Sequence, residues 1–230
     1  MSAPALAPVG TELLDDPSAD PATVARSLAN IARANRWFGG RAAALWGIDR
    51  LLCDLPTGRA LSLLDIGTGA GDLPAAAVRR AARRGRVLRA IGLERSPVAA
   101  ALAAGNGLPV VLACAGQMPV RAGAVDIVLI SQVAHHLSAD AAVDLFRAAS
   151  ALARIGVVVA DLRRSDVAVA AFRLGSAALG FDAVTRADGI TSVRRGYQPG
   201  ELAALAARAG QSAEVRRRPG FRLVATWRTR

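Results

Sequence analysis

The chain has 230 residues, of which 53% are hydrophobic, and its mean hydropathy is +0.32. This composition excludes a disordered chain and supplies the core of one decorated domain or of two small ones. Two cysteines exclude a disulfide framework and a cysteine-based zinc site. Glycines and prolines interrupt the longest uncharged stretch, 96–120, and the N-terminus lacks the pattern of a secretory signal. We therefore expect no membrane span and a cytoplasmic protein.

Arginine accounts for all 29 basic residues, and the formal net charge is +11. A charge this high favours nucleic acid as a partner. The arginines are spread over helices as well as clustered, however, and abundant arginine and alanine without lysine are typical of a GC-rich genome. We therefore do not expect nucleic acid to be the partner.

The first 56 residues predict an arm followed by two helices. Residues 1–20 are rich in proline, aspartate and alanine and predict a flexible arm. Apolar residues at helical spacing predict a helix over 21–35, and the glycine pair at 39–40 ends it. A second helix is predicted over 41–53. We expect these two helices to form an N-terminal helical cap over residues 21–56.

Short apolar runs then alternate with helical stretches. Strands are predicted at 61–66, 87–93, 108–113, 125–131 and 155–161, and helices at 72–84, 97–104, 138–153, 166–180 and 199–209. Strands at 213–218 and 221–227 flank Pro219-Gly220 and predict a hairpin. The alternation predicts an α/β fold, a doubly wound, mostly parallel seven-stranded sheet with an antiparallel edge hairpin. This domain spans 57–230, and residues 163–197 form an insertion that extends the cap.

The segment from Leu61 to Leu73 is the most informative part of the sequence. An apolar strand leads through Asp65 into three alternating glycines, Gly67, Gly69 and Gly71, and then into a helix. Glycines let a ligand approach the backbone closely, and the free N–H groups of the helix face that ligand. Glu94 ends the next strand, where an acid binds the hydroxyls of a ribose. The alternative is an ordinary strand-to-helix turn of another α/β protein.

Two further segments, Met118 to Leu129 and His135-His136-Leu137, complete a recognisable set of motifs. With the glycine loop and the acid, the sequence resembles the class I S-adenosylmethionine-dependent methyltransferases, in the small-molecule branch that is similar to ubiquinone and menaquinone methyltransferases. The motifs cover about residues 60–161. The resemblance implies a Rossmann-like methyltransferase fold and S-adenosylmethionine as the cofactor. The cofactor-binding residues it implies are Asp65, Gly67, Thr68, Gly69, Gly71, Glu94, Arg95, Cys114, Ala115 and Ser131.

Cys114 departs from the pattern of the family. An aspartate usually stands at this position and accepts a hydrogen bond from the adenine amino group, whereas a thiol is a poor acceptor. Either Gln117 or a backbone carbonyl takes over this contact, or cofactor affinity is reduced. The alternative for Cys114 is a small buried filler at the end of a strand.

His135 and Asp161 are the expected catalytic residues. Each follows or closes a strand, 125–131 and 155–161, and these strands are neighbours in the usual order of this fold. A histidine backed by a carboxylate is a suitable general base near neutral pH. Alternatively, both histidines pack beside the helix that begins at Ser138, and Asp161 pairs with a neighbouring arginine. No Asp-Asn pair follows Asp161, so we predict no metal ion.

The acceptor pocket is expected beneath the cap, and its few aromatic residues suit a flat aromatic molecule. Ordinary core packing is the alternative for each of these residues. The expected pocket residues are Trp37, Phe38, His136, Arg164, Phe172 and Tyr197. We predict O-methylation of a phenolic, polyketide or quinone-like natural product by a monomer or homodimer. The alternatives are an RNA methyltransferase and a non-catalytic partner protein with the same fold.

Overall fold

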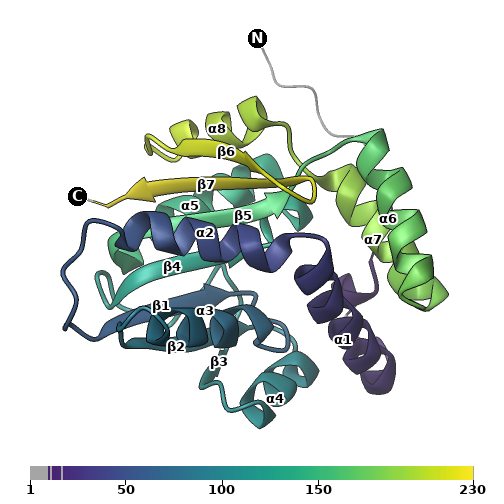
Figure 1. The fold of residues 1–230 in the computed structure, drawn as a ribbon, viewed down its shortest axis with the longest axis horizontal. Coiled ribbons are helices and arrows are strands. Elements are labelled where there is room, and N and C mark those ends of the chain that lie inside the picture. The colour runs from purple at the N-terminus through teal and green to yellow at the C-terminus, as the bar shows by residue number, and fades with distance from the viewer. Residues whose placement is uncertain (1–9, 11, 17, 230) are drawn as a thin grey trace.

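The computed structural model describes residues 10, 12–16 and 18–229. Within this part of the chain, seven strands form one sheet in the order β3-β2-β1-β4-β5-β7-β6 (Figure 1). Strands β1 to β5 run parallel, and β7 is antiparallel to both β5 and β6. The predicted α/β fold class is confirmed, including the antiparallel edge hairpin. The strands are β1 (Leu61–Ile66), β2 (Leu88–Glu94), β3 (Val110–Leu112), β4 (Val125–Ser131), β5 (Ala153–Leu162), β6 (Glu214–Arg218) and β7 (Arg222–Arg228).

Helices cover both faces of the sheet. On one face lie α2 (Gly40–Leu52) and α3 (Asp72–Ala82), and on the other lie α5 (Ala139–Leu152) and α8 (Pro199–Arg208). Alternate residues of β4 enter the two cores: Ile127 and Leu129 pack with α2 and α3, and Val128 and Ile130 pack with α5 and α8. Because β4 is buried on both faces, residues 127–130 at its centre are all apolar.

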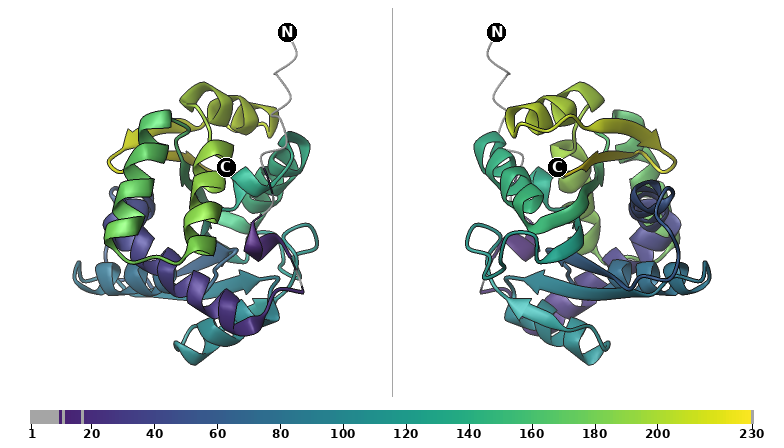
Figure 2. Two further views of the ribbon diagram at one scale, coloured as in Figure 1. Left: turned by 90° about the vertical axis from the view of Figure 1, so that its right-hand side faces the viewer. Right: turned by 90° about the vertical axis from the view of Figure 1, so that its left-hand side faces the viewer.

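A helical cap stands beyond the carboxyl ends of the parallel strands. It consists of α1 (Pro21–Trp37), α6 (Asp166–Ala178) and α7 (Ala183–Arg195), which lie side by side in both views (Figure 2). Helix α4 (Pro97–Gly105) contacts α1 at one side. The helix α7 was not predicted, because only Thr185 and Val193 are buried along its length and it has little apolar periodicity. The Asp182 side chain begins α7 by accepting a hydrogen bond from the Thr185 N–H at 2.9 Å.

The predicted flexible arm is wrong for the residues just before α1. Leu13–Asp15 form a short 3-10 helix, η1, with reciprocal capping contacts between Glu12 and Asp15. The Leu13 N–H donates to Asp188 of α7 at 3.0 Å, so this segment is docked on the cap. The rest of the predicted arm, apart from residues 10, 16 and 18–20, lies outside the described residues. Among the described helices, none has both the length and the apolar composition needed to cross a membrane.

Candidate active site

The loop after β1 turns sharply beneath the cap. Gly67, Gly69 and Gly71 have φ angles of +71°, +55° and +80°, which residues with a side chain rarely adopt. A Cβ on Gly67 would lie 2.4 Å from the Val133 side chain. The loop is therefore pressed against the segment that follows β4, and both segments face one cavity.

Asp65 places a buried carboxyl group behind this loop. Its Oδ2 accepts a hydrogen bond from Thr68 Oγ1 at 2.8 Å, and its Oδ1 is buried without a partner among the described residues. Burial raises the pKa of Asp65 to about 8, and the nearby charges of Asp72 and Glu94 add to this effect. An unpaired acceptor at this depth favours a ligand that donates a hydrogen bond or carries positive charge.

Glu94 is held rigidly at the carboxyl end of β2. Its Oε2 accepts from the Gly69 N–H at 2.9 Å, and its Oε1 accepts from the N–H groups of Arg95 and Ser96 at 2.8 and 2.9 Å. A carboxylate accepts about four hydrogen bonds, so Glu94, which already accepts three, keeps capacity on Oε2 for a further donor in the cavity. This arrangement fits the hydroxyls of a ribose. Cys114 is exposed and lines the same cavity, so it is not a buried filler.

One cavity of about 610 Å³ connects the glycine loop with the cap. Of the predicted site residues, Gly71, Asp161, Arg164 and Tyr197 are not part of its lining. Gly71 instead precedes α3 as its N-cap residue. The other predicted residues line this cavity. Toward the glycine loop lie Asp65, Gly67, Thr68, Gly69, Glu94, Arg95, Cys114, Ala115 and Ser131, and toward the cap lie Trp37, Phe38, His135, His136 and Phe172. Asp161 lies behind His135 and contacts its ring.

A buried dyad stands at the end of β4 and β5. His135, in the 3-10 helix η2 (Ala134–His136), has its Nδ1 2.6 Å from Asp161 Oδ1, and neither side chain is more than 1% exposed. Burial alone lowers the pKa of His135, but the charge and hydrogen bond of Asp161, with the charge of Glu12, outweigh it and hold the pKa above its usual value. Its Nε2 is buried without a partner among the described residues. This atom is therefore available to a ligand in the cavity.

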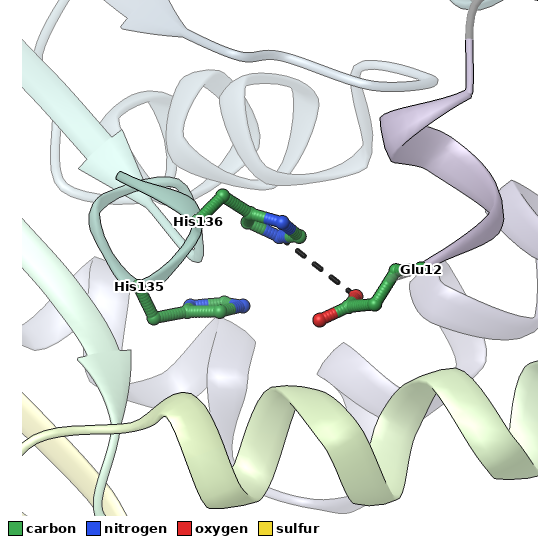
Figure 3. Close-up of side chains that lie close together, drawn as sticks. All are labelled: Glu12, His135 and His136. Carbon is green, nitrogen blue, oxygen red and sulfur yellow. Dashed lines mark ion pairs between the residues drawn. The ribbon is translucent and has the colours of Figure 1, made fainter. Parts of the chain in front are cut away.

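His136 and the docked N-terminal segment form a polar cluster beside the dyad (Figure 3). The Nδ1 of His136 lies 3.1 Å from Asp15 Oδ1, and burial together with the charge of His135 lowers the pKa of His136 to about 4. One ligand atom each of Glu12, His135 and His136 lies within 4.8 Å of the others, a set of groups that metal ions also use. Arg195 places its guanidinium 3.1 Å from Glu12, which opposes a second cation there. The absence of a metal ion stays a prediction.

Two aromatic rings form the apolar wall of the cavity. Phe38 and Phe172 meet edge to face with centroids 5.5 Å apart. A Cβ on Gly175 of α6 would lie 2.6 Å from the Phe38 ring, and one on Gly189 of α7 would lie 2.2 Å from the Phe172 ring. Glycine inside a helix costs about 1 kcal/mol, so these two helices give up stability to make room for the rings. Trp37 lies at the edge of the wall and is 63% exposed.

Tyr197 and Arg164 were predicted in the pocket, and the structure corrects both. The Tyr197 hydroxyl is buried and donates to the Ala134 carbonyl at 2.7 Å, because the ring fills the core behind η2. Arg164 points toward α8, where it pairs with Glu201 at 2.6 Å and donates to the Gly196 carbonyl at 2.7 Å. Tyr197 thus supports the turn that carries His135, and Arg164 ties the cap to α8.

The sequence interpretation missed a buried polar network between the cap and the sheet. Arg222 of β7 donates to the Gln132 amide at 2.8 Å and to the Phe38 carbonyl at 3.0 Å, and Gln132 donates to Asn35 at 2.6 Å. Burial lowers the pKa of Arg222 to about 10, although the charge of Asp161 opposes this effect. Gln132 has a φ of +56°, which is strained for glutamine. No sequence pattern marks this network. The Glu12-x-x-Asp15 spacing is not the usual capping-box sequence, so it did not mark the docked segment either.

Comparisons with known proteins agree with this geometry. Residues 64–160 match the family model described as a methyltransferase domain. A comparison with curated proteins found no sequence match. The expected resemblance to class I S-adenosylmethionine-dependent methyltransferases is confirmed: the central segment matches the methyltransferase-domain model, and the chain has the fold of that class.

Three solved structures illustrate the likeness. A SAM-dependent methyltransferase from Aquifex aeolicus superposes with a TM-score of 0.61 at 15% identity, covering 92% of this chain and 99% of that one. TnmH gives 0.63 at 23% identity, with 96% and 62% covered. Human N-acetylserotonin methyltransferase, solved with SAM, gives 0.64 at 11% identity, with 91% and 56% covered. The chain therefore spans less than two thirds of the last two proteins.

Proposed function

We propose that the chain is an S-adenosylmethionine-dependent methyltransferase that methylates a hydroxyl group of a small aromatic molecule of phenolic, polyketide or quinone-like type. The observation that carries the proposal is the single cavity, which has Asp65 and Glu94 at one end and the unpartnered Nε2 of His135 at the other. Two similar structures are named for small-molecule acceptors: magnesium protoporphyrin IX methyltransferase, solved with bound SAH, and N-acetylserotonin methyltransferase, solved with SAM.

The cofactor end of the cavity has the groups that S-adenosylmethionine requires. Glu94 offers a fixed carboxylate to the ribose hydroxyls, and the unpartnered Oδ1 of Asp65 suits a donor from the charged end of the molecule. Cys114 and Ala115 border the place expected for the adenine. When bound, the cofactor supplies a methyl group on a positively charged sulfur.

At the other end, His135 removes the proton of the acceptor. Its Nε2 accepts this proton, and Asp161 fixes the tautomer because it holds Nδ1 at 2.6 Å. Phe38 and Phe172 position a flat ring beside His135. The protein thus aligns the acceptor and supplies a base, which are the two tasks that methyl transfer to oxygen leaves to the enzyme.

Thermal unfolding with S-adenosylhomocysteine tests the cofactor half of the proposal. We expect this ligand to raise the Tm of the wild type, since it binds only the folded chain, and Glu94→Ala to lose most of the shift. Glu201→Ala is the matched control, because that carboxylate lies on α8 and outside the cavity lining. Equal Tm shifts in wild type and Glu94→Ala would refute the assignment of Glu94 to the ribose. A Tm shift with NAD but none with S-adenosylhomocysteine would refute S-adenosylmethionine as the cofactor.

A further inference from the structure

Burial of His135 leaves one problem for the proposed reaction. The side chain is 1% exposed, and its partner Asp161 is fully buried. A proton taken up by Nε2 must nevertheless leave before the next turnover. Asp161 does not provide an exit, because the nearby charge and hydrogen bond of His135 outweigh its burial and hold its pKa below the usual value. The exit must therefore lie on the cavity side of the ring.

Glu12 is the carboxylate on that side. One of its oxygens and one ring nitrogen of each histidine lie within 4.8 Å of one another, and Figure 3 shows the carboxylate facing the Nε2 edge of His135. One water molecule, or the acceptor hydroxyl itself, bridges such a separation. Burial raises the pKa of Glu12, although the charges of His135 and Arg195 oppose this effect, so a protonated state is accessible to it.

The position of Glu12 is fixed by α7. Ser192 Oγ donates to Oε2 at 2.8 Å, and Arg195 donates to Oε1 at 3.1 Å. Each carboxylate oxygen accepts two hydrogen bonds, so both oxygens keep capacity for a further donor. Glu12 is therefore held in place without being saturated.

Exposure increases outward from Glu12. Its side chain is 6% exposed, whereas those of His136 and Asp15 are 23% and 27% exposed. His136 Nε2 lies 3.9 Å from Glu12 Oε2, and His136 Nδ1 lies 3.1 Å from Asp15 Oδ1. The polar groups thus form a short series from the buried base to the surface, and the docked segment 12–15 supplies two of its members.

We propose that Glu12 carries the proton from His135 Nε2 to solvent between turnovers. This inference rests on the proposed function. During methyl transfer the acceptor O–H proton passes to Nε2; it then passes to a Glu12 oxygen, and finally to water by way of Asp15 or His136. His135 returns to the neutral form and Glu12 to the carboxylate, so protons and charge balance over one cycle.

Rapid-quench kinetics separates this role from binding and from methyl transfer. The assay uses the naphthol or hydroxyquinone that the wild type methylates fastest, with Glu12→Gln, the shorter acid Glu12→Asp, and Asp16→Asn as a matched control. Asp16 is exposed and lies on the same segment, and within the described part of the chain its side chain accepts hydrogen bonds from Ser18. At a pH above the pKa of His135, where this residue begins neutral, we expect Glu12→Gln to perform the first turnover within about threefold of the wild type. Later turnovers slow about 10- to 100-fold, so a burst appears.

Small buffers provide the second readout. Formate or imidazole is small enough to reach His135 in place of the missing carboxylate, and we expect either to restore the steady-state rate of Glu12→Gln as its concentration rises. Glu12→Asp retains part of the rate, and Asp16→Asn behaves as the wild type. Glu12 is not the proton carrier if the steady-state rate of Glu12→Gln is unchanged. The same holds if the first turnover of Glu12→Gln slows as much as its later turnovers and no buffer restores the rate. If the wild type transfers no methyl group, the proposed function itself fails.

Discussion

Asp161→Asn removes the negative charge of the buried dyad, and the asparagine side chain can keep the hydrogen bonds that Asp161 makes. The Oδ1 atom of Asp161 lies 2.6 Å from His135 Nδ1 and 2.7 Å from the Leu162 N–H. An asparagine oxygen accepts from both donors, and the Leu162 N–H requires an acceptor at that position. His135 therefore keeps its tautomer and loses only the neighbouring negative charge.

The expected magnitudes follow from these contacts. Asp161 Oδ2 has no partner among the described residues, so the new NH₂ group is buried without an acceptor and costs about 1–3 kcal/mol of folding free energy. Removal of the Asp161 charge leaves burial as the larger influence, which lowers the pKa of His135. We expect kcat at the pH plateau to fall about 10- to 100-fold, less than the 10²–10⁴-fold loss for removal of a general base.

The pH dependence of kcat/KM on a phenolic acceptor tests this reasoning. The rate of the wild type rises as the pH passes through the raised pKa of His135, and the same limb in Asp161→Asn moves to lower pH. Asp144→Asn is the control, because this exposed carboxylate on α5 pairs with Arg147 and lies outside the cavity lining. If the limb does not move, or if it follows the pKa of the phenol in both proteins, His135 is not the base.

Two further predictions concern the cap. Gly189→Ala places a Cβ 2.2 Å from the Phe172 ring, so we expect about 1–3 kcal/mol lower stability and a raised KM for the acceptor. Gly200→Ala is the control, because its Cβ meets no described atom within 4 Å, and we expect it to change neither quantity. Equal Tm values for the two variants would contradict the packing of Gly189 against Phe172. The pKa of His136 is depressed from 6.5 to about 4 by burial, so its contribution to stability is complete above pH 6.5 and is lost as the pH falls toward 4. Between pH 7.0 and 4.5, we expect the free energy of unfolding, measured with denaturant, to fall on the order of 2–3 kcal/mol more in the wild type than in His136→Gln. Identical decreases in the two proteins would mean that His136 is exposed to solvent.

Local sequence patterns were sufficient for the sheet and for the cofactor end of the site. Buried parallel strands appear as largely apolar runs between turn residues, as at residues 127–130 of β4, and the glycine loop with Glu94 combines turn geometry and charge within a short segment. Such signals are local, and they identified the strands and the loop near their observed positions. The dyad was predicted because His135 and Asp161 end strands that are neighbours in the sheet.

The acceptor end of the site depends on contacts that local patterns do not contain. Glu12 is bound by Ser192, which is 180 residues away in the sequence, and the composition around Glu12 resembles that of a loose arm. Helix α7 faces the cavity mainly through small and polar residues such as Asp188, Gly189 and Ser192, so its sequence lacks an apolar stripe. Tyr197 is aromatic and lies near the cap in sequence, yet its hydroxyl supports the backbone of η2 behind the cavity.

The central claim is that His135 takes the proton of an aromatic hydroxyl as this chain transfers a methyl group from S-adenosylmethionine. The most direct measurement incubates the wild type and His135→Ala with methyl-labelled S-adenosylmethionine and a panel of phenols, naphthols and hydroxyquinones, and follows the labelled product by mass spectrometry. We expect labelled methyl ether from the wild type and a rate about 10²–10⁴-fold lower from His135→Ala, with binding of S-adenosylhomocysteine unchanged. Label on no acceptor oxygen, or equal rates for the two proteins, would contradict the claim.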